Sequence, residues 1–175
     1  CQLSGRAQYR TPGSRCYIIY IDADRDRKSI LRTDIYGTVK DRAVLKGADM
    51  VGIVVVSHSE KLAESIVDLT RMMAAGAHIA AAGGLEDGSF GTSYDRIKAA
   101  IDAVYSDDGV IVLMDMGSAV MTTEMVLDEY DSAKVRMADA PVVESAVAAS
   151  VSAMCGSDLE TILGEIGDLK QTPKF

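Results

Sequence analysis

Two side chains of this sequence could take part in the transfer of a chemical group, and each follows an apolar run. His58 lies in Ser57-His58-Ser59, and a neutral imidazole has one unprotonated nitrogen that can act as a nucleophile near physiological pH. Asp115 follows another apolar run, and a carboxylate there could orient an imidazole N–H. The alternatives are a loop histidine without a chemical role and a carboxylate that caps a helix. The second histidine, His78, is expected to have a structural or surface role.

A phosphoryl group on His58 would find hydrogen-bond donors nearby. A helix that begins just after this histidine would present free backbone N–H groups, which bind phosphate. A glycine-rich loop, 83–93, ends in Thr92-Ser93, and one of these two should cap the next helix while the other could bind phosphate oxygens. We therefore expect a catalytic set of His58, Asp115 and Thr92, and a phosphate-binding set of Ser57, Ser59, Gly91, Ser93, Gly117 and Ser118.

Four short apolar runs, each followed by a helical pattern, would position these residues. The β-branched run 51–56 is typical of a strand buried on both faces. Similar runs occupy 77–82, 110–114 and 134–138.

The first helical pattern begins close to His58. Ser57 and Glu60 have the spacing of a capping box, so a helix should start there and end at Gly76. Its apolar side is predicted from residues at helical spacing, namely Leu62, Ile66, Leu69 and Met73. Further helices are predicted from about 94 to 104, up to about 129, from Pro141 to about 154, and after a second capping-box pattern at Ser157 and Glu160.

The β-α order, repeated four times, predicts an α/β fold. Short loops and crossover helices favour an open, mainly parallel four-stranded sheet with helices on both faces. In such sheets ligands bind beyond the carboxyl ends of the strands, at a switch point. The loops expected on that edge are all polar or glycine-rich: 57–59, 83–93, 115–118 and Asp139.

The composition changes sharply at Met50. Residues 1–49 hold ten Lys/Arg and six Asp/Glu, whereas residues 50–175 hold eight and twenty. The first segment has one short strand-like run, 16–21, followed by mixed charges with no sustained period. We predict that 1–49 is an N-terminal extension outside the domain and that 50–175 form one domain. The alternative is a hairpin within 1–49 that packs on the domain.

Charge, cysteine usage and missing motifs exclude several classes of function. The net charge of −8 over 175 residues argues against a nucleic-acid partner, and no apolar run approaches the roughly 20 residues that span a bilayer. The three cysteines form no CxxC and there are two histidines, so no metal site is expected. The motifs GxxxxGK[ST], GxGxxG and GxSxG are absent, which disfavours nucleotide binding and serine hydrolysis.

Several motifs taken together are typical of one family. They are Met50–Ser59 with its Ser-His-Ser, the Gly83-Gly84 pair, Phe90–Ser93, Met114–Ala119 and Lys134–Glu144. In these motifs the chain resembles the DhaM family, the phosphotransferase subunits of PTS-dependent dihydroxyacetone kinases, whose first domain is similar to mannose-type EIIA domains. The resemblance extends from Met50 to about Gly167.

The resemblance implies a phosphotransferase that works as a phosphohistidine carrier. HPr, charged by Enzyme I and phosphoenolpyruvate, would phosphorylate His58, which matches the family's phosphoacceptor. The phosphoryl group would then pass to ADP held by the DhaL subunit, while DhaK presents dihydroxyacetone. Thr92 and Asp115 match positions that line this site. The resemblance also implies a cytoplasmic homodimer with no bound cofactor, the phosphoryl group being carried covalently on His58.

Two features depart from the family pattern, and two other functions stay open. Residues 1–49 match nothing in the family, and Ser145 stands where a glycine is expected. One alternative is a mannose-type sugar EIIA domain, which would deliver the phosphoryl group to an EIIB domain. The other is a non-catalytic regulatory domain on the same fold. The Ser-His-Ser and Met-Asp-Met-Gly-Ser motifs favour the dihydroxyacetone branch.

Overall fold

The computed structural model describes residues 18–21, 29–33, 39–44 and 50–171. It divides the chain into two compact units, Cys1–Ala48 and Asp49–Phe175, and each is described by itself. The expectation that 1–49 lie outside the functional domain stays a prediction.

The first unit contains a small antiparallel sheet. Its strands lie in the order β1 (Ile18–Ile21), β2 (Ser29–Thr33) and β3 (Val39–Val44). The sequence predicted one strand in this part of the chain and missed the other two, because the charged residues of β2 and β3 interrupt any apolar pattern.

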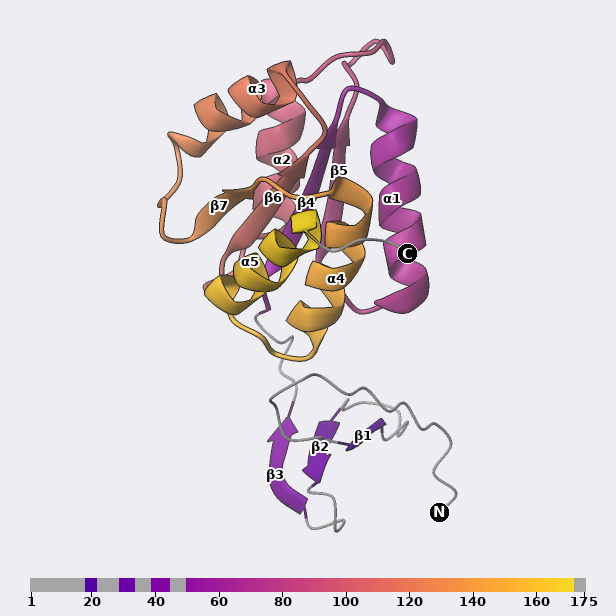
Figure 1. Ribbon diagram of the computed structural model, residues 1–175, viewed down its shortest axis with the longest axis vertical. Helices are drawn as coiled ribbons and strands as arrows, with labels where there is room; N and C mark the ends of the chain where they lie inside the picture. Colours follow the sequence, from indigo (N-terminus) through magenta and orange to yellow (C-terminus); the bar gives the residue numbers. More distant parts are fainter. Residues whose placement is uncertain (1–17, 22–28, 34–38, 45–49, 172–175) are drawn as a thin grey trace. The chain divides into compact units, whose positions relative to one another are not determined.

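The second unit is built on a four-stranded parallel sheet, which confirms the predicted fold class (Figure 1). Its strands lie in the order β5 (Ile79–Gly83), β4 (Gly52–Ser57), β6 (Val110–Met114) and β7 (Val135–Ala138). Each neighbouring pair is parallel. These strands are the four apolar runs of the sequence.

Helices cover both faces of this sheet (Figure 1). One face packs against α1 (Glu60–Met73), α4 (Val142–Met154) and α5 (Leu159–Asp168), the last followed by a short 3₁₀ turn, Leu169–Gln171. The other face packs against α2 (Tyr94–Val104) and α3 (Ser118–Leu127).

The side chains of the central strands alternate between these two cores. In β4, Ile53 and Val55 pack on the side of α1, α4 and α5, while Val54 and Val56 pack on the side of α2 and α3. All four are fully buried. A strand that is covered on both faces needs apolar side chains at every position, which explains the unbroken apolar run.

The connections that follow β4 and β6 diverge at the carboxyl end of the sheet. The two strands are neighbours, but α1 and α3, which follow them, cover opposite faces. Such a switch point leaves a crevice in which α/β proteins bind ligands. The register pairs Val56 with Met114, so the residues that come next, Ser57 and Asp115, meet at this point.

The structure corrects both predicted helix caps. The N-cap of α1 is Ser59, whose hydroxyl accepts a first-turn N–H at 3.3 Å, whereas Ser57 is still part of β4. The N-cap of α5 is Asp158 and not Ser157. Serine and aspartate cap helices equally well, so a capping-box spacing cannot decide between neighbouring candidates.

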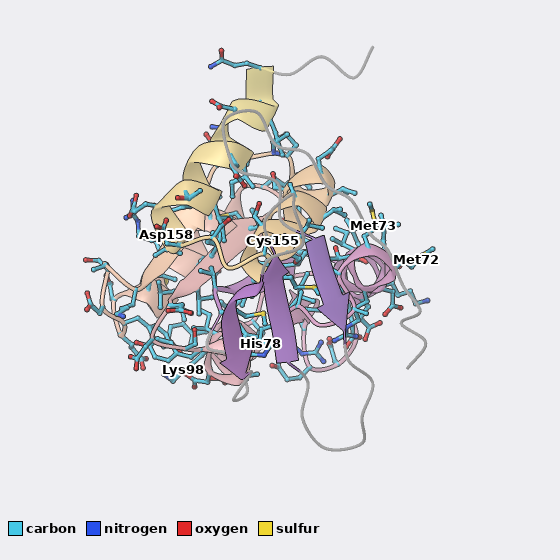
Figure 2. The ribbon with its side chains drawn as sticks, turned by 90° about the horizontal axis from the view of Figure 1, so that it is seen from below. Met72, Met73, His78, Lys98, Cys155 and Asp158 are labelled. Atoms are coloured by element: carbon cyan, nitrogen blue, oxygen red, sulfur yellow. The ribbon has the colours of Figure 1, made fainter. Side chains whose placement is uncertain are left out.

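The predicted apolar side of α1 is wrong as well. The buried residues are Ala63, Ile66, Val67 and Thr70. Leu62, Leu69 and Met73 are 47%, 44% and 60% exposed. The helix turns its smaller side chains toward the sheet, and the larger ones lie along its outer side. Met72 and Met73, labelled in Figure 2, project outward from its C-terminal end.

Candidate functional site

His58 lies in the connection between β4 and α1, at the carboxyl end of the sheet. Its side chain is 27% exposed, so the ring is partly covered and still reachable from solvent. Asp115 follows β6 directly, and its side chain is 19% exposed. The structure thus brings together, at the switch point, the histidine and the carboxylate that the sequence singled out.

The Asp115 carboxylate accepts four hydrogen bonds, two of them from His58. Its Oδ1 lies 2.9 Å from Nδ1 of the His58 ring and accepts the N–H of Met116 at 2.7 Å. Its Oδ2 accepts the backbone N–H of His58 at 2.9 Å and the hydroxyl of Ser57 at 3.0 Å. The carboxylate is therefore held on both oxygens, and it fixes the main chain and the ring of the histidine together.

These hydrogen bonds decide the charge of Asp115. Burial raises its pKa, but the hydrogen bonds from His58, Met116 and Ser57 outweigh burial and hold the pKa below the usual value of 3.8. The carboxylate is consequently ionised at physiological pH.

The two nitrogens of the His58 ring have different roles. An ionised carboxylate can only accept a hydrogen bond, so Nδ1 carries the proton and donates a hydrogen bond to Asp115. In the neutral ring Nε2 is then unprotonated, and it accepts the hydroxyl of Ser118 at 2.7 Å. Nε2 is therefore the ring nitrogen whose lone pair is not taken by a proton, a distinction that the sequence did not provide.

The hydroxyls of Ser57 and Ser59 are engaged within the protein. Ser57 is 1% exposed, donates to Asp115 and accepts the backbone N–H of Ser59 at 3.1 Å. Ser59 caps α1. Phosphate binding by these serines stays a prediction, and in the structure their hydroxyls position the carboxylate and the start of the helix.

The glycine-rich loop after β5 contacts the His58 segment through its backbone. The N–H of Gly91 donates to the carbonyl of His58 at 2.9 Å, and the N–H of Gly84 donates to the carbonyl of Ser57 at 3.2 Å. The N–H of Gly91, expected to bind phosphate, is thus occupied by His58. The loop supports the main chain that carries the histidine.

Gly83 is the point of closest approach between β5 and α1. A Cβ at this position would lie 2.5 Å from the carbonyl oxygen of Ser59 and 2.7 Å from Cα of Glu60. Both are backbone atoms, which cannot rotate out of the way. Glycine is therefore required for the end of β5 to pack this close to the start of α1.

We expect Gly83→Ala to destabilise the second unit by about 1–3 kcal/mol, the usual cost of overpacking a buried position. Urea unfolding measures this free energy. As a control, Gly164→Ala in α5 places a Cβ that meets nothing within 4 Å, so it should be neutral or stabilising by about 0.5–1 kcal/mol. Equal stability of wild type and Gly83→Ala would mean that the start of α1 shifts freely.

Thr92 and Ser93 have separate partners. Ser93 is the N-cap of α2, as expected of one of the two, and its hydroxyl also donates to Glu86 at 2.6 Å. The hydroxyl of Thr92 lies 3.1 Å from that of Thr122 on α3 and links the loop to that helix. Contact of either residue with a phosphoryl group stays a prediction.

The start of α3 lies against Nε2 of His58. Gly117 is the N-cap, with φ of +50°, and no side chain caps this helix. In α3 the N–H groups of Ala119 and Val120 donate to the carbonyls of Met116 and Gly117 at 3.0 and 3.1 Å, while the helix dipole favours an anion at this end. Ser118, the first residue of α3, touches Nε2 of His58, and phosphate binding by Gly117 and Ser118 stays a prediction.

His78 lies at the other end of the sheet. It precedes β5, is exposed, and is labelled in Figure 2, which views the molecule from that end. In the described part of the chain, no group of three or more His, Cys, Asp or Glu side chains is arranged to hold a metal ion. Among the helices described, none is both long enough and apolar enough to cross a bilayer.

Sequence reasoning missed Arg96, which reaches this neighbourhood from α2. Its guanidinium contacts Glu60 at the start of α1 and the carbonyl of Gly83 at the end of β5. Arg96 and Glu60 are 36 residues apart, and no motif or period connects two charges at that separation.

Comparison with known proteins first gives the class. The family model for the PTS system fructose IIA component, EIIA-man, matches residues 52–163, more than half of the chain. Together with the fold and the switch-point histidine, this match makes the second unit a mannose-type EIIA domain.

The DhaM phosphoryl donor subunits of PEP-dependent dihydroxyacetone kinase from Pantoea ananatis and Escherichia coli strain K12 are 43% and 40% identical to this chain over 121 residues. The chain belongs to the DhaM family.

The relatives differ in length from this chain. The matches to the Pantoea and Escherichia proteins cover 65% of this chain and 26% of theirs, so it spans about a quarter of those relatives. The DhaM phosphotransferase subunit of PTS-dependent dihydroxyacetone kinase from Lactococcus lactis is 36% identical over 111 residues, which cover 63% of this chain and 89% of that protein.

Solved structures share the fold. The crystal structure of a protein of unknown function is 30% identical, with a TM-score of 0.59, and the match covers 68% of this chain and 94% of that one. The phosphotransferase system component EIIA from Streptococcus agalactiae is 16% identical, with a TM-score of 0.54, over 72% of this chain and 98% of its own.

Proposed function

We propose that this chain is a phosphohistidine carrier of a PTS-dependent dihydroxyacetone kinase. His58 accepts a phosphoryl group from phospho-HPr and passes it to ADP bound by DhaL, while DhaK presents dihydroxyacetone. The observation that carries the proposal is the oriented ring, with Nδ1 on an ionised Asp115 and Nε2 unprotonated beside the start of α3. The DhaM relatives, described as phosphoryl donor or phosphotransferase subunits, support it.

In the accepting step the lone pair of Nε2 attacks the phosphorus. The bond between phosphorus and the donor's histidine nitrogen breaks, and its electron pair returns to the donor ring. The hydroxyl of Ser118 occupies the lone pair of Nε2 in the structure, so it must turn away, after which it can donate to a phosphoryl oxygen. The positive end of the α3 dipole favours the charge on the other phosphoryl oxygens.

The charge that forms on the ring explains the need for Asp115. When Nε2 bonds to phosphorus while Nδ1 keeps its proton, the imidazole gains positive charge, and the carboxylate 2.9 Å away stabilises it. Phosphoryl transfer leaves the protein mainly positioning and electrostatics to supply, and this site supplies both. In the donating step an oxygen of the ADP β-phosphate attacks the phosphorus and the bond to Nε2 breaks.

The surface next to His58 fits a basic partner with an apolar patch. Exposed apolar side chains come from the glycine-rich loop, the connection after β6 and α3: Phe90, Met116, Met121 and Met125, all more than 60% exposed. Residues 85–93 and 115–129 contain six Asp/Glu and no Lys or Arg, and two of the six pair with cations of α2, Glu86 with Arg96 and Glu129 with Lys98. We propose this surface for HPr and then for DhaL, because methionine side chains adapt to different partners.

Reconstitution of the relay tests the proposed function. Incubation with phosphoenolpyruvate, Enzyme I and HPr should add the mass of one phosphoryl group, in an acid-labile and alkali-stable bond. Addition of DhaL–ADP, DhaK and dihydroxyacetone should then remove it and yield dihydroxyacetone phosphate. No mass gain would favour a regulatory domain, and discharge by an EIIB domain in place of DhaL would favour a sugar-specific EIIA.

The family suggests the remaining parts of the proposal. They are a cytoplasmic location, a homodimer, and a phosphoryl group held covalently on His58 with no bound cofactor. Sedimentation of the full chain measures the oligomeric state.

A further inference from the structure

Arg96 joins three segments around the candidate site. Its Nη1 donates to Oε1 of Glu60 and to the backbone carbonyl of Gly83, both at 2.7 Å. Its Nε lies 3.9 Å from Oε1 of Glu86. Glu60 is the first residue of α1, Gly83 is the last of β5, and Glu86 belongs to the glycine-rich loop. One side chain of α2 is thus connected to the helix, the strand and the loop next to His58.

His58 lies within the part of the backbone that these contacts hold. It is two residues before Glu60, and its carbonyl accepts the N–H of Gly91 in the loop. The backbone of Gly83 leaves no room for a Cβ against Ser59, so the strand end and the helix start are in close contact. A shift of α1 relative to β5 would therefore move the histidine relative to Asp115, which follows β6.

We propose that Arg96 is a positioning residue for phosphoryl transfer, which fixes the start of α1 against the end of β5 and so holds the His58 ring beside Asp115. Arg96 acts on the ring through its contacts with Glu60 and Gly83. The inference rests on the proposed carrier function and adds a residue to its site. The hydrogen bond to Glu60 raises the pKa of Arg96, which keeps the guanidinium charged.

The geometry predicts which substitutions are tolerated. Because one nitrogen makes both short contacts, the planar fork of arginine is not needed, and a lysine ammonium has three donors of its own. Arg96→Lys should therefore keep the function. Arg96→Met removes the charge and the donors while it keeps an unbranched side chain.

Lys98 provides a matched control on the same helix. Its Nζ lies 2.8 Å from Oε2 of Glu129, and its side chain is 36% exposed, against 30% for Arg96. Lys98, labelled in Figure 2, pairs with a residue just after α3 and not with the His58 segment. Lys98→Met thus removes a comparable ion pair from α2 without touching α1 or β5.

The first measurement is phosphorylation of the full chain at varied concentrations of phospho-HPr. In Arg96→Met we expect the rate at saturating donor to fall about tenfold, which corresponds to about 1.4 kcal/mol. The half-saturating HPr concentration should stay within about twofold, because Arg96 acts on the ring and not on docking. Arg96→Lys should stay within about threefold of wild type, and Lys98→Met should match wild type.

The second measurement does not depend on phosphorylation. Amide hydrogen exchange at Gly84 and Gly91 reports the bonds to the carbonyls of Ser57 and His58. It should be faster in Arg96→Met than in Lys98→Met and near wild type in Arg96→Lys. If Arg96→Met and Lys98→Met had the same phosphorylation rate and the same amide exchange, the proposal would be overturned. It would also be overturned if Arg96→Lys lost as much of the phosphorylation rate as Arg96→Met. A wild-type chain that accepts no phosphoryl group would instead overturn the carrier function, while exchange would still test Arg96.

Discussion

Phosphoryl labelling should disappear in His58→Ala, because the proposed transfer needs the unprotonated Nε2 that Asp115 and Ser118 orient. This is the largest effect that we expect from any substitution. The fold should persist, since His58 belongs to neither of the two apolar cores and its side chain is partly exposed. Intact mass after incubation with phosphoenolpyruvate, Enzyme I and HPr measures labelling, and circular dichroism on heating measures the fold.

His78→Ala is the control for this experiment. His78 is exposed at the opposite end of the sheet, so its variant should be labelled like wild type. Normal labelling of His58→Ala would contradict the assignment of the phosphoacceptor. Loss of labelling in His78→Ala with retention of the fold would move the site to the other end of β5.

Asp115→Asn should slow phosphoryl acceptance by about 100-fold or more. In another enzyme, a serine protease, the same change beside a catalytic histidine costs about 10⁴-fold because the ring adopts the wrong tautomer. The rate at saturating phospho-HPr measures the loss. Asp158→Asn is a suitable control, because Asp158 is also a hydrogen-bonded carboxylate but lies at the N-cap of α5, where it accepts the N–H of Thr161.

The hydrogen bonds of Asp115 show why an amide cannot replace it. All the backbone and side-chain groups around the carboxylate donate to it, including the N–H groups of His58 and Met116. An asparagine that turns its NH₂ toward Nδ1 forces the ring proton onto Nε2, which removes the nucleophile. The opposite orientation leaves the N–H of His58 without an acceptor. Ring ¹⁵N shifts should therefore report protonated Nε2 or a displaced loop, and unchanged shifts with an unchanged rate would contradict this role.

The carboxylate of Asp115 also makes the free energy of unfolding depend on pH in the acidic range. Its pKa in the folded protein lies below the ordinary 3.8, so its contribution is present above that value and is lost as the pH falls through the folded pKa. The difference in unfolding free energy between wild type and Asp115→Asn should therefore shrink below about pH 4. A difference that is constant down to pH 2 would show that the hydrogen bonds do not favour the ionised form.

The sequence predicted the sheet and the central pair of the site for a physical reason. Strands buried on both faces need unbroken apolar runs, so β4 and β6 were visible without structural data. The polar residues directly after such runs must lie at the carboxyl edge of a parallel sheet. His58 and Asp115 could be paired on this basis, before their register was known.

Other features of the fold and the site could not be predicted from local sequence patterns, because they depend on contacts in the folded protein. On α1, two overlapping stripes share Ile66, and only packing against the sheet selects the one with Ala63 and Thr70 over the one with Leu62 and Leu69. The role of Arg96 depends on contacts with segments 13 and 36 residues away. The choice of Nε2 depends on which side of the ring the carboxylate occupies, which is a matter of three-dimensional geometry.

The hydrogen bond between Nδ1 and Asp115 has a consequence for the direction of the proposed relay. Since Asp115 keeps the Nδ1 proton in place, the ring needs neither to gain nor to lose a proton when it is charged or discharged. The phosphorylated ring stays cationic and is therefore a good leaving group. By microscopic reversibility, forward and backward transfer at this site then pass through the same transition state. The net flow is set by the ratio of charged to uncharged donor and acceptor, and the carrier itself imposes no direction.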